Sequence, residues 1–202
     1  MRIGVGPPGR LLFLHYKSMN SIAKDHWAAG VSRKLDTVAI SSGKFFAWMI
    51  FPMILSLAFE VIARYGFGKP TMWAYDMTFM LYGTFFMLGA SFTLQRQGHI
   101  RTDMYYGRWS PRRQAVVDLF GYIILFYPFI LILCFTGFEY FWKAFQTNEK
   151  FVSSPWMPVT WPFKLVLPLS GLLLAIQGIS EILKCFVAIS TGAWPEERGD
   201  HE

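Results

Sequence analysis

Four apolar runs, each long enough to cross a bilayer, constrain this chain more than any other feature. A membrane-spanning helix needs about 20 mostly apolar residues, so four of them use about 80 of the 202 residues. The runs predict transmembrane helices at about 45–64, 73–95, 115–138 and 162–183. Only short loops and tails remain, which leaves no room for a soluble domain. We therefore expect an all-α integral membrane protein of four transmembrane helices, with its membrane domain at 35–189.

The basic residues predict how these helices are oriented. Of the 19 Lys and Arg residues, 14 fall in the N-terminal segment, between the second and third runs, or at the C-terminal end. Short cytoplasmic loops carry an excess of Lys and Arg, so both termini are expected in the cytoplasm. Residues 1–34 then form a basic, flexible cytoplasmic segment, and 190–202 a cytoplasmic tail. The sequence pI of 9.4 is thereby explained by topology, and no nucleic-acid partner is expected.

Prolines and capping residues predict where the helices begin and bend. Pro52 should kink the first span, because proline removes a helical hydrogen bond, and Pro128 should bend the third. Thr71 is expected to cap the second span, and Ser110 followed by Pro111 should start the third. From Pro111 to residue 144 that helix would be about 50 Å long.

Charged residues mark both sides of the first turn. Glu60 and Arg64 are four residues apart and can pair on one helix face. This pair either neutralises itself at the headgroups, which we favour, or contacts a partner helix. Asp76 is stabilised by the helix N-terminus, and we expect Arg64 to reach it across the hairpin as well. No ionisable residue lies at the middle of a predicted span, which favours a supporting role over a proton or ion path.

Two further groups are candidate contacts. His99, Arg101 and Asp103 form a polar cluster after the second span, which chemistry alone describes as a solvated loop end. Gly171, Ala175 and Gly178 recur on one face of the fourth span and would let another helix approach closely, although chance small residues are a nearly equal explanation. One His and one Asp are too few for a metal site. We expect no metal, no cofactor and no enzymatic activity.

The hairpin also carries an ordered set of motifs. They are Glu60-Val61, Arg64-Tyr65-Gly66-Phe67 with Pro70, Trp73, Asp76, and Gly98-His99-Ile100-Arg101-Thr102-Asp103. Together they resemble the small permease subunit of tripartite ATP-independent periplasmic (TRAP) transporters, the DctQ type, over roughly residues 35–189. One departure is Tyr75, where the family often has a second acid, so a role needing two carboxylates is not expected here.

The resemblance implies an accessory subunit in the bacterial inner membrane. Its partners would be a larger permease subunit, which it braces, and a periplasmic solute-binding protein. Such transporters import organic acids, often carboxylates, with an ion gradient. The resemblance also raises the expectation of a partner contact at the polar cluster. The predicted subunit-interface or structural residues are Glu60, Arg64, Trp73, Asp76, His99, Arg101, Asp103, Gly171, Ala175 and Gly178.

Two other functions remain open. The chain could be a self-sufficient small transporter or channel that works as a homo-oligomer, with Glu60 as the coupling acid. The less favoured alternative is the membrane anchor of an electron-transfer complex. A bis-histidine haem needs histidines deep in the spans, whereas His15, His26 and His201 lie in the tails.

Overall fold

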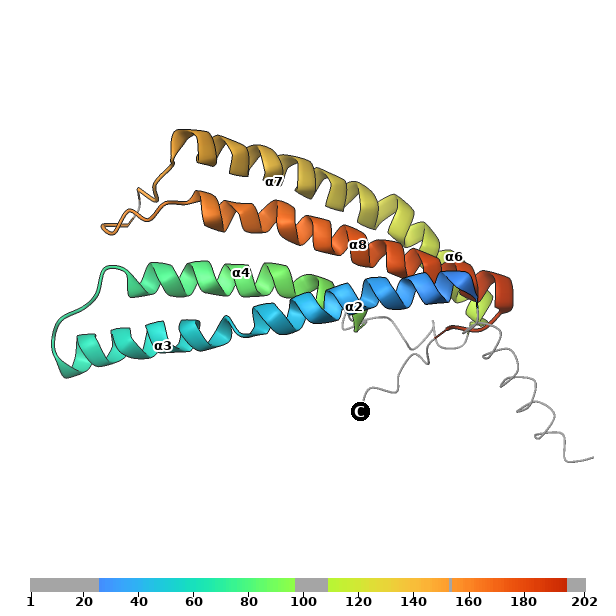
Figure 1. The fold of residues 1–202 in the computed structure, drawn as a ribbon, viewed down its shortest axis with the longest axis horizontal. Coiled ribbons are helices and arrows are strands. Elements are labelled where there is room, and N and C mark those ends of the chain that lie inside the picture. Colours follow the sequence, from blue (N-terminus) through green and yellow to red (C-terminus); the bar gives the residue numbers. More distant parts are fainter. Residues whose placement is uncertain (1–25, 97–108, 153, 196–202) are drawn as a thin grey trace, which may run out of the picture. The chain divides into compact units, whose positions relative to one another are not determined.

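The structure, a computed structural model, describes residues 26–96, 109–152 and 154–195. Its helices are α2 (Trp27–Ala47), α3 (Ile50–Val61), α4 (Ala74–Gln95), α6 (Pro111–Gly121), α7 (Tyr127–Thr147) and α8 (Trp161–Thr191). Two π-helical turns, η1 (Ile62–Gly66) and η2 (Tyr122–Phe126), follow α3 and α6. Among the described residues, four helical segments are long and apolar enough to cross a membrane (Figure 1): Trp27–Gly66, Ala74–Gln95, Pro111–Thr147 and Trp161–Thr191. The predicted four-helix membrane fold is confirmed.

The helical interruption before Pro52 has a direct chemical cause. A proline ring crowds the carbonyl of the residue four positions earlier, here Trp48. Helix α2 ends at Ala47, Trp48 and Met49 form a turn, and α3 starts at Ile50. The break is visible between the α2 and α3 labels (Figure 1). The π-helical turn η2 similarly lies just before Pro128, so both predicted proline sites coincide with irregular helix.

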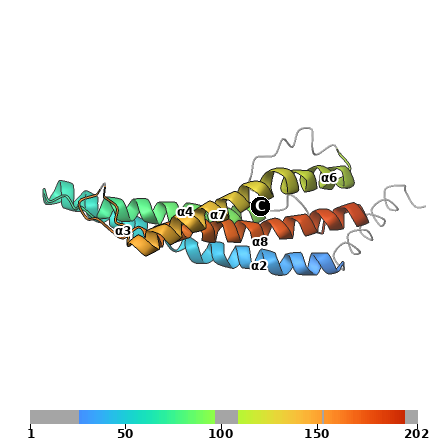
Figure 2. The same ribbon diagram turned by 90° about the horizontal axis from the view of Figure 1, so that it is seen from above.

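The chain forms two compact units. Of the described residues, unit 1 contains 26–36, 109–126 and 178–195. In it, the start of α2 lies along the end of α8 (Figure 2). Small residues allow close approach: Ala28 and Ala29 are buried with Val187 and Ala193. On another side of α8, Ala115 of α6 is buried with Cys185 and Ala188.

Two expectations about the ends of unit 1 are corrected. Residues 27–34, expected to be flexible, belong to α2 because their small side chains pack on α8. Helix α8 continues eight residues past the predicted end, to Thr191. Gly192 then has φ 77°, a left-handed conformation that ends helices and favours glycine. The following residues are packed as well, since Trp194 Nε1 donates to Gln114 Oε1 at 3.2 Å.

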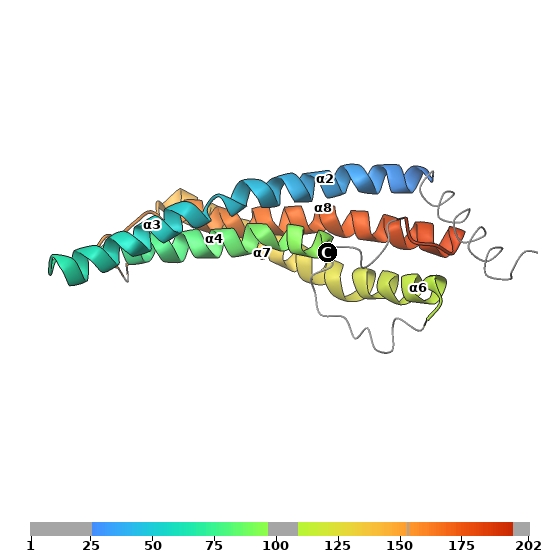
Figure 3. The same cartoon turned by 90° about the horizontal axis from the view of Figure 1, so that it is seen from below.

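Of the described residues, unit 2 contains 37–96, 127–152 and 154–177. Helices α3 and α4 run side by side as a hairpin (Figure 3), tied by the Ser56 hydroxyl, which donates to the Ala74 carbonyl at 3.0 Å. Helix α4 begins at Ala74 with no side-chain cap, so the predicted cap at Thr71 is wrong. In unit 1, helix α6 starts at Pro111 as predicted, although the Ser110 side chain makes no capping bond.

Candidate functional site

Glu60 lies at the centre of a group of contacts that we call the hairpin cluster, with Arg64 and Thr71. Glu60 Oε1 accepts from Arg64, whose Nε is 2.8 Å away. Glu60 Oε2 accepts from the Thr71 amide at 2.9 Å and from the Thr71 hydroxyl. The Glu60 side chain is 9% exposed and that of Arg64 52%. Thr71 therefore serves Glu60 instead of capping α4, and it fastens the turn to α3.

Asp76 finds a partner other than the one expected. It is buried in the first turn of α4 and accepts a hydrogen bond from the Ser154 hydroxyl, in the loop between α7 and α8. No ion pair joins Asp76 to Arg64, both of which the structure describes. The neighbouring Trp73 precedes α4 and stacks on Phe59, with ring centroids 5.6 Å apart. The hairpin is thus held by Glu60, Ser56 and ring stacking, and Asp76 anchors a loop.

The small residues of α8 are occupied within the chain. A Cβ built on Gly171 would lie 2.6 Å from Cys134 Sγ of α7, so α7 takes up the space that the glycine leaves. The Ala175 carbonyl accepts from the Tyr127 hydroxyl at 3.1 Å. Gly178 is buried. Gly171 and Ala175 therefore serve the packing of α7 on α8.

Sequence reasoning missed a second charged group, which we call the α2–α8 cluster, consisting of Asp36, Glu181 and Lys184. Lys184 Nζ lies 2.8 Å from Asp36 Oδ2 and 2.9 Å from Glu181 Oε1. Their side chains are at most 5% exposed. The Ser180 hydroxyl donates to Asp36 Oδ1 at 2.6 Å and lies 3.1 Å from the carbonyl oxygen of Ser32.

The cluster lies on residues that the sequence analysis did not select as candidates. Glu181 is ten residues before the end of α8, and Asp36 lies inside α2. A signal was available: Glu181 and Lys184 are three residues apart on an apolar helix, and Ser32 and Asp36 are four apart. Asp36 and Glu181 are 145 residues apart in the sequence. Their proximity could be predicted only with knowledge that α2 packs on α8.

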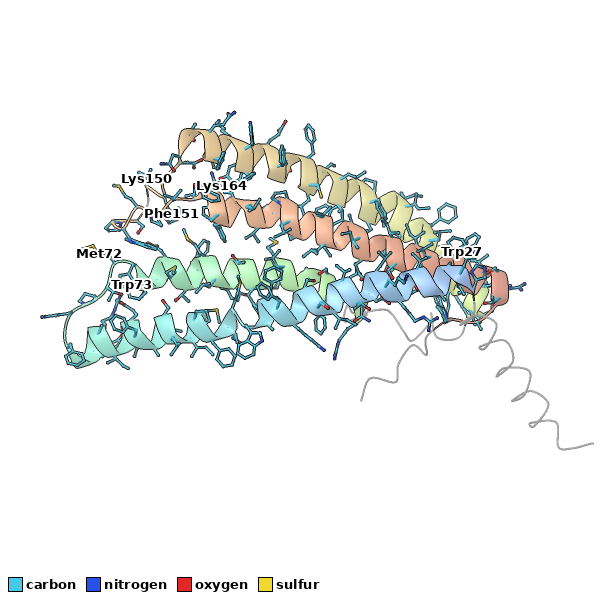
Figure 4. The ribbon with its side chains drawn as sticks, viewed as in Figure 1. Trp27, Met72, Trp73, Lys150, Phe151 and Lys164 are labelled. Atoms are coloured by element: carbon cyan, nitrogen blue, oxygen red, sulfur yellow. The ribbon has the colours of Figure 1, made fainter. Side chains whose placement is uncertain are left out.

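A third group surrounds two cavities in unit 2, where the loop between α7 and α8 meets α4 and the start of α8. Lys164 is buried, with its Nζ 2.6 Å from Glu149 Oε2 and 3.7 Å from the centroid of the Tyr140 ring. The labelled Lys150, Phe151 and Lys164 lie together at this loop (Figure 4). The cavities have volumes of about 480 and 740 Å³. Their shared wall is formed by Met80, Lys150, Phe163 and Val166.

The polar cluster after the second span and a metal site were also considered in the sequence analysis. His99, Arg101 and Asp103 lie outside the described residues. Within 26–96, 109–152 and 154–195, no group of three or more His, Cys, Asp or Glu residues could hold a metal ion.

Comparison with known families decides the identity. A family model described as "Tripartite ATP-independent periplasmic transporters, DctQ component" matches residues 53–188. The chain belongs to this family. No curated protein and no solved structure matches it.

As a DctQ component, the chain is a small subunit of a TRAP transporter and a multi-pass membrane protein. The match includes the hairpin cluster, Glu181 and Lys184, but begins after Asp36. The α2–α8 cluster of this DctQ component therefore joins the matched region to a helix that precedes it.

Proposed function

We propose that this DctQ component is an accessory subunit of the bacterial inner membrane that braces the large permease subunit of its transporter. The transporter imports an organic acid, with the solute and the coupling ion bound by the large subunit and the solute delivered by a periplasmic binding protein. One observation carries this proposal. The six charged side chains that are buried among the described residues all have a partner within the chain: Asp36, Glu60, Asp76, Lys164, Glu181 and Lys184.

These internal partners favour an accessory subunit over a self-sufficient transporter. A coupling acid has to exchange its partner for a proton or an ion during each cycle, so ionisable groups in transport paths face a cavity or a pathway. Glu60, the coupling acid of the self-sufficient alternative, accepts from Arg64 and from both donors of Thr71. Such contacts favour a rigid scaffold over a moving carrier.

We propose that the large subunit packs on one face of α4, where exposed side chains have few contacts within the chain. Tyr75, Tyr82, Phe86, Gly89 and Thr93 recur at helical spacing along one face of α4. The three aromatic residues are more than half exposed. The Tyr82 hydroxyl makes no hydrogen bond to the part of the chain that the structure describes. A hydroxyl in hydrocarbon is costly, which favours a protein acceptor on a partner helix.

Gly89 makes this surface testable. A Cβ built on Gly89 would meet nothing within 4 Å, so a larger side chain leaves the subunit itself undisturbed. A partner helix packed on this face would instead meet that side chain. Gly121 of α6 has equally open surroundings, and it offers the same substitution on a different helix.

The test is to purify the transporter through an affinity tag on the large subunit and to measure how much DctQ component is recovered. We expect Gly89→Leu to reduce recovery and organic-acid uptake together, and Gly121→Leu to leave both unchanged. Uptake of labelled organic acids into liposomes that contain the wild-type DctQ component alone would overturn the accessory function. Normal recovery of Gly89→Leu would overturn the assignment of α4 as the contact surface.

The cytoplasmic location of both termini is part of the same proposal. Lys164 and Lys184 are buried in ion pairs and do not report on topology. Without them, 13 basic residues remain on the proposed cytoplasmic side and 4 on the other. Alkaline phosphatase, active only outside the cytoplasm, should be inactive when fused after Pro195 and active after Lys150. The opposite pattern would invert the topology.

A further inference from the structure

We propose that the two cavities beside the loop between α7 and α8 hold one anionic phospholipid, with one acyl chain in each cavity and its headgroup at Lys150. The site is separate from the proposed contact surface on α4. It gives the subunit a bound lipid of defined charge, which adds to the accessory function without depending on it.

The walls of the cavities suit acyl chains. The first is lined by apolar residues such as Phe79, Met87 and Leu167, and the second by Met77, Leu88 and Leu169. Leu88 is 14 residues from the start of α4, a depth of about 20 Å. Along α4 the first cavity is lined from Phe79 to Met87 and the second from Met77 to Leu88, which are about 12 and 17 Å. One leaflet of a bilayer supplies about 15 Å of hydrocarbon, so both walls have about the length of one leaflet.

The separation of the cavities suits a lipid with two chains. Met80, Phe163 and Val166 belong to both cavities and form a ridge between them. The Phe163 ring is fixed there by the Phe79 ring, with centroids 5.8 Å apart, and it fills the space beside Gly83. Away from the charged mouth, the apolar side chains that line these cavities offer water none of the two to four polar partners that it needs. Two acyl chains on either side of this ridge would restore the missing packing contacts.

The charge at the mouth selects the headgroup. Lys164 is neutralised by Glu149 at 2.6 Å. Lys150 lines both cavities, is exposed, and has no ion pair with any described residue. The mouth therefore carries one uncompensated positive charge. Basic residues beside gaps between transmembrane helices attract anionic headgroups.

The experiment measures lipid retained by the full-length subunit in mild detergent, by native mass spectrometry. Phosphatidylglycerol and phosphatidylcholine with identical acyl chains are the probes. We expect the wild-type chain to retain one phospholipid and to prefer phosphatidylglycerol. Lys150→Glu should reduce that preference by about five-fold or more, the effect of one lysine at an anionic lipid surface. Lys143→Glu, an exposed lysine of α7 that lines neither cavity, is the matched control and should change nothing.

Substitutions that fill one cavity at a time test the two acyl-chain sites separately. Met87 lines only the first cavity and Leu169 only the second. Met87→Trp and Leu169→Trp should each weaken retention of both lipids, whereas Leu131→Trp on the exposed side of α7 should not. Unchanged thermal unfolding would show that these variants fold.

Three outcomes would overturn the lipid site. The first is that the Met87→Trp and Leu169→Trp variants retain as much phospholipid as the wild-type protein. The second is an equal effect of Lys143→Glu and Lys150→Glu, which would indicate only a general surface attraction. The third is loss of the lipid when the subunit is purified with the large permease, which would make the cavities a protein contact. None of these outcomes depends on transport, so each is distinguishable from failure of the accessory function.

Discussion

The hairpin cluster places one carboxylate beside a basic side chain and the α2–α8 cluster places two, and the two clusters are held in different ways. Glu60 and Arg64 are neighbours on one helical turn, and the Arg64 side chain is 52% exposed. Asp36 and Lys184 come from helices at opposite ends of the sequence, and both side chains are 5% exposed. The hairpin cluster also has two donors from Thr71, so its carboxylate depends on Arg64 for only part of its hydrogen bonding.

The fold should depend on these two clusters to different degrees. An exposed ion pair contributes little, because water replaces the lost partner. A buried pair that loses one partner leaves a charge without water, which is strongly destabilising. The α2–α8 cluster should therefore govern whether α2 stays packed on α8, whereas the hairpin cluster should refine a turn that chain connectivity already closes.

The largest expected effect is that of Lys184→Met. The substitution leaves Asp36 and Glu181 buried without their shared cation, which costs about 3–5 kcal/mol in comparable pairs. We expect a large fall in the thermal unfolding midpoint of the detergent-purified subunit, followed by tryptophan fluorescence. Adding Asp36→Asn and Glu181→Gln to Lys184→Met should recover part of the loss, because neutral groups replace the buried charges. A midpoint like that of the wild type for Lys184→Met alone would show that water reaches the cluster.

Arg64→Ala should have a smaller effect, roughly half or less of that of Lys184→Met. Glu60 keeps both Thr71 donors in this variant, and water can reach the position that Arg64 leaves. The midpoint of the subunit and the amount of assembled transporter should both fall modestly, and Glu60→Gln added to Arg64→Ala should restore part of each. Normal assembly with complete loss of uptake would contradict this structural role and place Arg64 in the transport cycle.

Thr71→Val tests whether the turn depends on its side chain or its backbone. Valine keeps the shape and the amide that donates to Glu60 at 2.9 Å, but removes the hydroxyl donor. The loss of one of several donors should lower the midpoint less than Arg64→Ala does, by about 1 kcal/mol or less for the hydroxyl of Thr71. An effect larger than that of Arg64→Ala would reverse the order within the hairpin cluster.

The contrast between the clusters also explains which contacts could be predicted from the sequence and which could not. The Glu60–Arg64 pair was predictable because a four-residue spacing fixes the geometry on a helix. The four spans and the break at Pro52 were predictable because they depend on local composition and on one missing amide. The partners of Asp36 and Asp76 were not, because Lys184 and Ser154 reach them only through tertiary packing. The end of α8 was missed because Gly192, a helix-ending residue, lies beyond the apolar run.

The smallest expected effect is that of Asp76→Asn, which tests a buried carboxylate that has a hydrogen-bond donor but no ion pair. Asparagine retains an oxygen that can accept from Ser154, and the start of α4 tolerates a neutral residue with a loss of about 1 kcal/mol or less. Ser154→Ala should cost more, because it removes the hydroxyl and leaves the buried Asp76 carboxylate without its donor. The midpoints of the two variants, measured side by side, decide whether Asp76 acts as a charge or as a hydrogen-bond acceptor. If Asp76→Asn is the more damaging, the negative charge itself is needed, and Asp76 belongs with the α2–α8 cluster as a residue whose ionisation the fold depends on.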